Sequence, residues 1–251
     1  GGIDGVRSLG IATDGTVIAA VEGGQRMLRL ALDDEADAPL ACNANEPWRT
    51  GNGWTGRAAG LAWDAGTFLA ADEVGKQLWG FDPWHTGFQE TPWPKVTEPG
   101  TFAEPRAVAV GDTRAWVLDG GRIVELDRQT LATRDVTEPR LPDLTTAVAL
   151  AAGLRELLFV AFPDRVVALS GPPDGTYVVE WEATGLRGVA GIAVAGKTVV
   201  VSERDGRCVS VFDGQNGTSG TALGTADVPG GMLPPPGTSA VPSAVPLVPF
   251  W

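Results

Sequence analysis

Gly191-Ile192-Ala193-Val194, a short turn, and then Thr198-Val199-Val200-Val201-Ser202-Glu203 form the stretch of this sequence that decides its fold. A small residue alternates with a large one, an apolar run ends on an acid, and the base Arg207 follows. The same cassette occurs four more times in the 251 residues, with its first large residue at positions 11, 61, 108 and 148. The copies therefore start 50, 47, 40 and 44 residues apart. Self-similarity at this period is typical of propellers and solenoids.

Each copy divides into four strand-sized segments separated by turn residues. In four copies an acid follows the first large residue by 11 positions; these acids are Glu22, Asp72, Asp119 and Glu203. The fourth copy is divergent, because it contains three extra residues, Leu154-Arg155-Glu156, and ends on Phe162 instead of an acid. Third strands are expected at 26–32, 76–81, 122–126, 165–169 and 207–212, and fourth strands at 39–42, 88–91, 132–136, 177–181 and 221–225.

Short strands punctuated by Gly, Pro and Asp predict an all-β fold, a β-propeller of four-stranded blades. Five blades are recognisable, and a sixth position would be filled by terminal or external strands. The small residues of each first strand suit close packing around a crowded axis. The propeller is predicted over residues 1–228, with blades near 5–45, 55–95, 102–140, 144–184 and 187–226. Residues 229–251 contain seven prolines and are predicted to form an extended tail or linker.

The cassette resembles the NHL-repeat family of β-propellers, whose units end the second strand on an acid and begin the third with a base. The pairs that carry this resemblance are Glu22 with Arg26, Asp72 with Lys76, Asp119 with Arg122, and Glu203 with Arg207. It covers about residues 5 to 226 and implies architecture, since such folds host binding modules, lyases and lactonases alike. Phe81-Asp82-Pro83-Trp84 and the closing Val245 to Trp251 also resemble, over short stretches, propeller regions of phage-tail-like proteins of contractile injection systems.

Composition excludes some classes of partner. A formal net charge of −12 argues against nucleic acid, since binding to phosphates rests on Lys and Arg. There is no apolar run of about 18 residues and no charged-then-apolar leader, which predicts a soluble chain, cytoplasmic or part of a released particle, without membrane insertion. Cys42 and Cys208 lie far apart without metal-ligand spacing, so they are interpreted as two unrelated thiols.

No residue pattern points to catalysis or to a cofactor. The single histidine, His85, lies in an expected loop without a sequence-adjacent nucleophile, and no established catalytic motif occurs in a supporting context. The repeated acids could form a ring of carboxylates around the axis that binds a cation, but their place before a base favours turn and ion-pair roles. The first strands offer mainly Gly, Ala and aliphatic residues, which leaves a metal-dependent lactonase or lyase without ligands. We therefore predict neither a metal nor a cofactor, and we favour a non-enzymatic chain.

Tryptophan and arginine supply the candidate contact residues. Trp63, Trp79, Trp116 and Trp181 fall in expected strands and are interpreted as inter-blade core. Four others lie in the long connections 34–58 and 83–104 and are candidates for partner contacts: Trp48, Trp54, Trp84 and Trp93. Four arginines precede first strands and could line one mouth of the ring, where they would attract an acidic ligand or subunit: Arg7, Arg57, Arg106 and Arg187.

The leading functional hypothesis is a β-propeller that serves as a protein-interaction or structural assembly module, as part of a phage-tail-like particle if the second resemblance holds. Two alternatives remain open: a metal-dependent lactonase or lyase propeller, and a carbohydrate-binding propeller that stacks sugars on its loop tryptophans.

Overall fold

The computed structural model describes residues 6–12, 17–21, 26–30, 47–48, 56–64, 66–81, 97–136, 143–171, 176–214 and 222–227. These residues form antiparallel sheets whose strand order follows the sequence. The first sheet contains β1 (Ser8–Ile11), β2 (Val17–Val21), β3 (Arg26–Leu30) and β4 (Pro47–Trp48), and the second contains β5 (Ala58–Asp64), β6 (Thr67–Asp72) and β7 (Gln77–Phe81). The third contains β8 (Pro105–Val110), β9 (Arg114–Asp119), β10 (Arg122–Asp127) and β11 (Thr133–Asp135).

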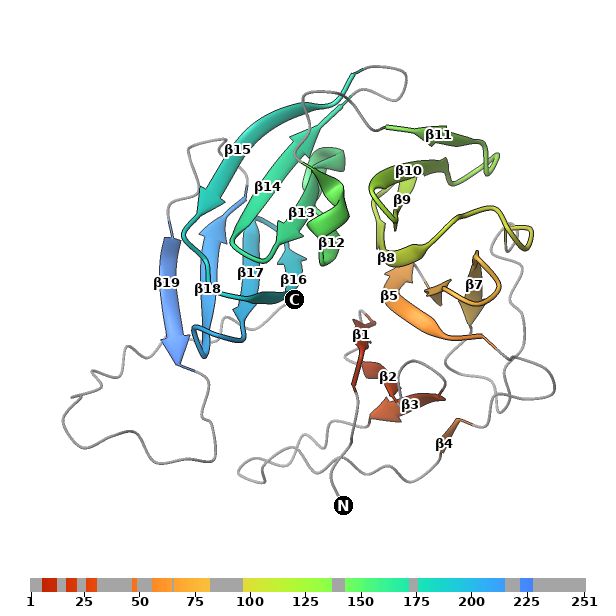
Figure 1. Cartoon of the computed structure of the whole chain (residues 1–251), viewed down its shortest axis with the longest axis horizontal. Coiled ribbons are helices and arrows are strands. Elements are labelled where there is room, and N and C mark those ends of the chain that lie inside the picture. The colour runs from red at the N-terminus through yellow and green to blue at the C-terminus, as the bar shows by residue number, and fades with distance from the viewer. Residues whose placement is uncertain are drawn as a thin grey trace.

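The fourth sheet contains β12 (Ala149–Ala152), β13 (Leu158–Phe162), β14 (Arg165–Ser170) and β15 (Val178–Thr184), and the fifth contains β16 (Val189–Ala195), β17 (Thr198–Glu203), β18 (Cys208–Asp213) and β19 (Ala222–Asp227). Two short 3-10 helices, η2 (Leu144–Thr146) and η3 (Leu154–Glu156), flank β12. Figure 1 shows the sheets arranged in an arc, with the first strand of each innermost and the last outermost. The predicted all-β, propeller-like fold of four-stranded blades is confirmed.

Successive sheets pack face to face through apolar clusters. Ile18 and Phe68 belong to the cluster between the first and second sheets, and Leu69 and Val117 to the next. The clusters between the third and fourth and between the fourth and fifth sheets are centred on larger aromatic side chains, Trp116 and Trp181. All four strand tryptophans lie in or against these clusters, as predicted, and Trp116 is fully buried.

Small residues on the inner strands allow this packing. A Cβ atom added to Gly60 on β5 would lie 2.8 Å from the Cα atom of Ala107 on β8, which is too close for two carbon atoms. A Cβ atom added to Gly10 on β1 would meet the ring of Phe68 at 2.7 Å. The alternation of small and large residues in the sequence is therefore a requirement of close contact between neighbouring inner strands.

Two strand assignments from the sequence need correction. The outer strand of the first sheet is β4, whose residues Pro47 and Trp48 pair with Leu28 and Met27 on β3, rather than residues 39–42, which lie outside the described residues. Pro47 fits there because an outermost strand does not need every backbone donor. The bases Lys76 and Arg207 do not begin third strands; they occupy left-handed turn positions, with φ of 55° and 51°, immediately before β7 and β18. The strand expected at 88–91 also lies outside the described residues.

Candidate functional site

The repeated acids bind backbone amides of their own blade. The Asp72 carboxylate accepts hydrogen bonds from the backbone N–H of Arg57 at 2.9 Å and of Val74 at 3.0 Å. The Asp119 carboxylate accepts from the backbone N–H of Ala103 at 2.8 Å and from that of Glu104. Each acid is buried and lies 15 or 16 residues after the amide at the beginning of the inner strand.

Glu203 has the same role, because its carboxylate accepts from the backbone N–H of Arg187 at 2.7 Å. Among the acids that the structure describes, the predicted ion pair with the following base is present for Asp119, which binds Arg122 at 2.7 Å. In the fourth sheet, where Phe162 replaces the acid, the corresponding amide of Ala147 donates instead to the carbonyl of Leu144 at 3.1 Å, the last bond of η2. Glu22 lies outside the described residues.

The four candidate arginines lie at this same end of the inner strands. Three of them form ion pairs with acids of this chain. Arg7 and Arg57 both bind Glu73, and the Arg57 Nη1 to Glu73 Oε1 distance is 3.0 Å. Arg106 binds Glu104 at 2.7 Å and donates to the carbonyl of Thr145 at 3.0 Å. The Arg187 side chain is exposed. Arg7 and Arg106 thereby link neighbouring sheets, the first to the second and the third to the fourth.

The four candidate tryptophans are placed only in part. Trp48 lies in the outer strand β4 rather than in a connection. Trp54, Trp84 and Trp93 lie outside the described residues, so their partner-binding role stays a prediction.

The Glu73 cluster predicts a pH-dependent contribution to stability. Burial opposes ionisation, but hydrogen bonds from Arg7 and Arg57 outweigh it and hold the pKa of Glu73 below its ordinary value. A lowered native pKa stabilises the fold above the pKa of the unfolded chain, and this stabilisation is lost as pH falls through the native pKa. Glu73→Gln should therefore cost about 1 kcal/mol of unfolding free energy at neutral pH and progressively less toward acid pH. Urea titrations across that range test this, with the exposed Glu98→Gln as control; a pH-independent difference would contradict it.

The opposite end of the inner strands contains a buried ion pair. Asp64 is the last residue of β5 and only 5% exposed, and its Oδ1 binds the guanidinium of Arg128, in the turn after β10. Arg128 also donates to the carbonyl of Gly111 at 2.8 Å and to that of Asp112. A hollow of about 380 Å³ lies beside this pair, between the ends of β5, β8, β12 and β16.

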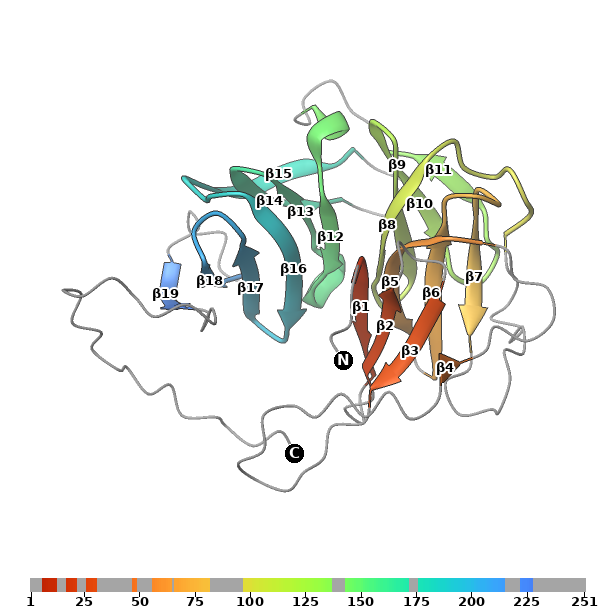
Figure 2. The same ribbon diagram turned by 60° about the horizontal axis from the view of Figure 1, so that its bottom comes forward.

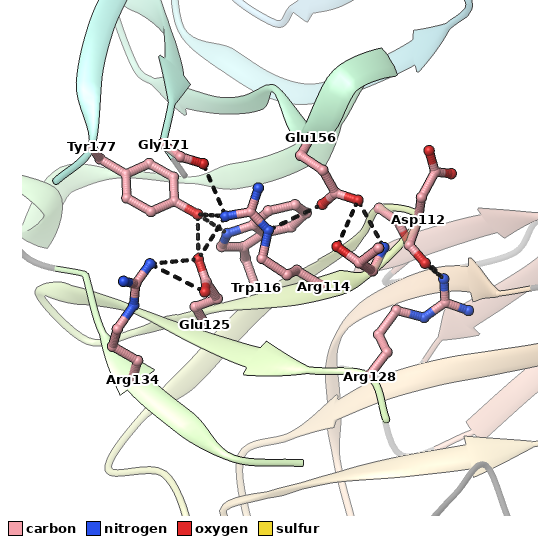
Figure 3. A network of polar contacts seen from close by, with 11 residues as sticks. Asp112, Arg114, Trp116, Glu125, Arg128, Arg134, Glu156, Gly171 and Tyr177 are labelled. Atoms are coloured by element: carbon pink, nitrogen blue, oxygen red, sulfur yellow. Dashed lines mark hydrogen bonds and ion pairs between the residues drawn. The ribbon is translucent and has the colours of Figure 1, made fainter. Parts of the chain in front are cut away.

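A polar network extends from this end into the interface between the third and fourth sheets (Figure 3). Arg114 is almost fully buried and lies 3.2 Å from Glu125 and 3.4 Å from Glu156. It also donates to the Tyr177 hydroxyl at 3.1 Å, and that hydroxyl accepts from Trp116 Nε1 at 2.8 Å and donates to Glu125. Burial and the bond to Glu125 raise the pKa of Tyr177 well above its usual value, so the phenol stays a neutral donor.

Glu156 ties the divergent insertion to this network. Its carboxylate accepts from the backbone N–H of Thr113 at 2.7 Å, across from the fourth sheet to the β8–β9 turn of the third. Arg155 and Glu156 both have φ of 60°, an unfavourable region for residues with a side chain, so the contact holds a strained turn. A second hollow, of about 760 Å³, has Arg114, Glu125 and Arg134 among its lining residues.

Sequence reasoning missed these residues. The sequence predicts that the inner strand ends at Trp63, whereas β5 also includes the next residue, Asp64. Arg114 and Glu125 occupy ordinary strand positions. The sequence feature that could have identified them is a charged residue beside or within an apolar run. Arg114 precedes Ala115-Trp116-Val117-Leu118, and Glu125 lies between Val124 and Leu126.

The described part of the chain has neither a cluster of metal ligands nor a membrane-spanning helix. No three side chains of His, Cys, Asp or Glu gather there in a way that could hold a metal ion. No helix there is long and apolar enough to cross a membrane.

Comparisons with known proteins give structural neighbours only. No protein-family model and no curated protein matches the sequence. A catalytically inactive virginiamycin B lyase from Staphylococcus aureus, solved with quinupristin, is similar with a TM-score of 0.57 and 13% identity, over 89% of this chain and 70% of the lyase. A candidate 6-phosphogluconolactonase from Bacteroides uniformis has a TM-score of 0.57 and 14% identity, over 84% of this chain and 67% of that one.

A chain of a nidogen–laminin complex is also similar, with a TM-score of 0.52 and 12% identity, over 84% of this chain and 93% of that one. At these identities the likenesses show the fold alone.

Proposed function

We propose that this chain is a non-enzymatic propeller that docks onto another protein through the outward face of its first sheet. One observation carries the proposal: on the inner strand β1, Leu9 is 54% and Ile11 62% exposed. The alternate residues of the strand face the second sheet, where Gly10 packs on Phe68 and the Ser8 hydroxyl accepts from the backbone N–H of Leu61 at 2.9 Å.

Inner strands that lie between two sheets present apolar side chains to both neighbours. On β8, Ala107 and Ala109 belong to one inter-sheet cluster and Val108 to the other. In Figures 1 and 2 the first and fifth sheets stand apart, so β1 borders the open side of the arc. Val6, 47% exposed, adjoins the strand. Burying a side chain of the size of Leu or Ile stabilises a complex by about 1.5–3 kcal/mol.

The partner should therefore offer an apolar β-sheet face. Since this chain has a net charge of −12, basic residues around that face would favour encounter. The nidogen–laminin structure supports the proposal, because a chain of similar fold is there part of a complex between proteins. The lyase and lactonase names belong to the other neighbours, and an enzyme of that type remains the alternative. The phage-tail particle and the sugar-binding tryptophans stay predictions, supported by none of the structures named above.

Photo-cross-linking in cells of the source organism tests the proposal. A benzophenone amino acid at position 11 should cross-link to one protein, identified by mass spectrometry, that the same group at position 179 does not capture. Val179 is a matched control, an apolar residue 45% exposed on the outer strand β15. The purified partner should bind the chain, and Ile11→Lys should weaken binding at least tenfold. Cross-links from position 11 only to residues of this chain, or equal binding by Ile11→Lys, would overturn the proposal.

A further inference from the structure

The last rung of each inner strand differs in chemistry between the sheets. This rung is the last residue pair between the first and second strands of a sheet. In three sheets the pairs are Ile11 with Val17, Asp64 with Thr67, and Ala195 with Thr198. Gly111 and Gly153 occupy it in the other two sheets, where their backbone N–H groups donate to the carbonyls of Arg114 and Leu157. Asp64 is thus the one charged side chain among these five positions.

Asp64 is incompletely paired. Its side chain is 4% exposed, and one oxygen, Oδ1, binds Arg128. The other, Oδ2, is buried and has no hydrogen-bond partner among the residues that the structure describes. A buried carboxylate oxygen without a donor is costly, by an amount comparable to a charged hydrogen bond. Asp64 Oδ2 is therefore an unsatisfied acceptor that a hydrogen-bond donor would stabilise, most strongly a cationic donor.

The hollow beside Asp64 is an open depression large enough for a small molecule. At about 380 Å³ it lies within the usual range for such pockets. Val110, Ala152 and Val194 form apolar walls, and the indole of Trp63 provides an aromatic surface whose Nε1 is also buried without a hydrogen-bond partner in the described region. Leu154, 48% exposed, lines the hollow. Its turn is the strained insertion held by Glu156.

Charge selects the class of ligand. Arg128 is balanced by Asp64, and Asp112, an exposed residue that also lines the hollow, adds a second carboxylate. The net charge of these three side chains is negative, so an anion is disfavoured. An ammonium group could donate to Asp64 Oδ2 and lie against the Trp63 ring, where cation–π attraction adds to the ion pair.

We propose that this hollow binds a small organic cation, an ammonium group carried on an apolar or aromatic body. The ammonium pairs with Asp64 once the atoms that bury Oδ2 move aside, and the body packs between Val110, Val194 and Leu154. This site lies at the opposite end of the inner strands from the candidate arginines and is independent of the outward face of β1.

Calorimetry and ligand-observed NMR with three matched probes test the proposal: phenethylamine, its neutral isostere 2-phenylethanol, and the anion 3-phenylpropionate. The amine should bind the wild-type chain at least tenfold more tightly than the other two. Asp64→Asn should remove most of that preference while leaving binding of the alcohol unchanged. Asp164→Asn is the control, because Asp164 is an exposed carboxylate in the β13–β14 turn at the other end of the inner strands.

Two further variants avoid the buried ion pair, should Asp64→Asn fold poorly. Leu154→Ala should weaken binding of all three probes several-fold, since it removes apolar wall, and Asp112→Asn should weaken the amine alone by about twofold to threefold. Unfolding midpoints confirm that each variant is folded. Equal affinity of amine and alcohol, no amine binding at millimolar concentration, or full amine binding by folded Asp64→Asn would each overturn the proposal.

Discussion

Replacing Arg114 with methionine is expected to lower the free energy of unfolding by about 3–5 kcal/mol, the usual cost of removing one partner from a buried ion pair. The Arg114 side chain is 6% exposed and lies 3.2 Å from Glu125 and 3.4 Å from Glu156. It also donates to the carbonyl of Gly171 at 3.0 Å. Methionine fills similar space but leaves the buried Glu125 carboxylate with Arg134 as its remaining cation, at 3.2 Å. Urea denaturation of both chains measures the difference.

Arg165→Met is the matched control. Arg165 also bridges two acids, Asp164 at 3.5 Å and Glu182 at 3.3 Å, but both acids are exposed. Its loss should cost about 1 kcal/mol or less. The double variant Arg114→Met with Glu125→Met should be more stable than the sum of the single effects implies, because it leaves no buried charge of the pair unmatched. A loss below about 1 kcal/mol for Arg114→Met would show that the network does not hold the third sheet to the fourth.

The network also explains why the fold could be predicted more completely than the candidate site. The blades can be predicted from the regular spacing of small residues along the sequence. Each inner strand needs such residues for close packing, as the contact of Gly60 with Ala107 shows. The network, by contrast, joins Arg114 to Tyr177, 63 residues away and directly before β15 of the next sheet. No local pattern connects them. Asp64 could not be predicted for a related reason. Its carboxylate becomes a candidate binding group only in the folded chain, where the strand ends of the other sheets surround it.

The repeated acids are an intermediate case. Their regular position was visible in the sequence, but their partners were not, because the partners are backbone amides that carry no sequence signal. A following base suggested an exposed ion pair, whereas Asp72 and Asp119 are 1% and 2% exposed. Burial of the acids explains the regularity better, since a buried carboxylate needs donors and the backbone amides at this one position supply them.

Asp119→Ala is therefore expected to lower the free energy of unfolding by about 2–4 kcal/mol, since it removes the charged acceptor of two backbone amides, those of Ala103 and Glu104, and the ion pair with Arg122. Asp119→Asn should recover about half of this loss, because the side-chain carbonyl can still accept from the amides while the charge that binds Arg122 is gone. Thermal and urea unfolding of the wild-type chain and the two variants measure the order of their stabilities.

The fourth sheet supplies the reciprocal test. There the amide of Ala147 already donates to the carbonyl of Leu144, and Phe162 is 1% exposed with the Arg165 guanidinium over its ring at 4.7 Å. Restoring the acid by Phe162→Asp should destabilise the chain, because the new carboxylate would find its amide taken and the buried phenyl ring would no longer fill the core. If Asp119→Ala were neutral, or Phe162→Asp stabilising, the acids could not be the groups that fasten each inner strand to its blade.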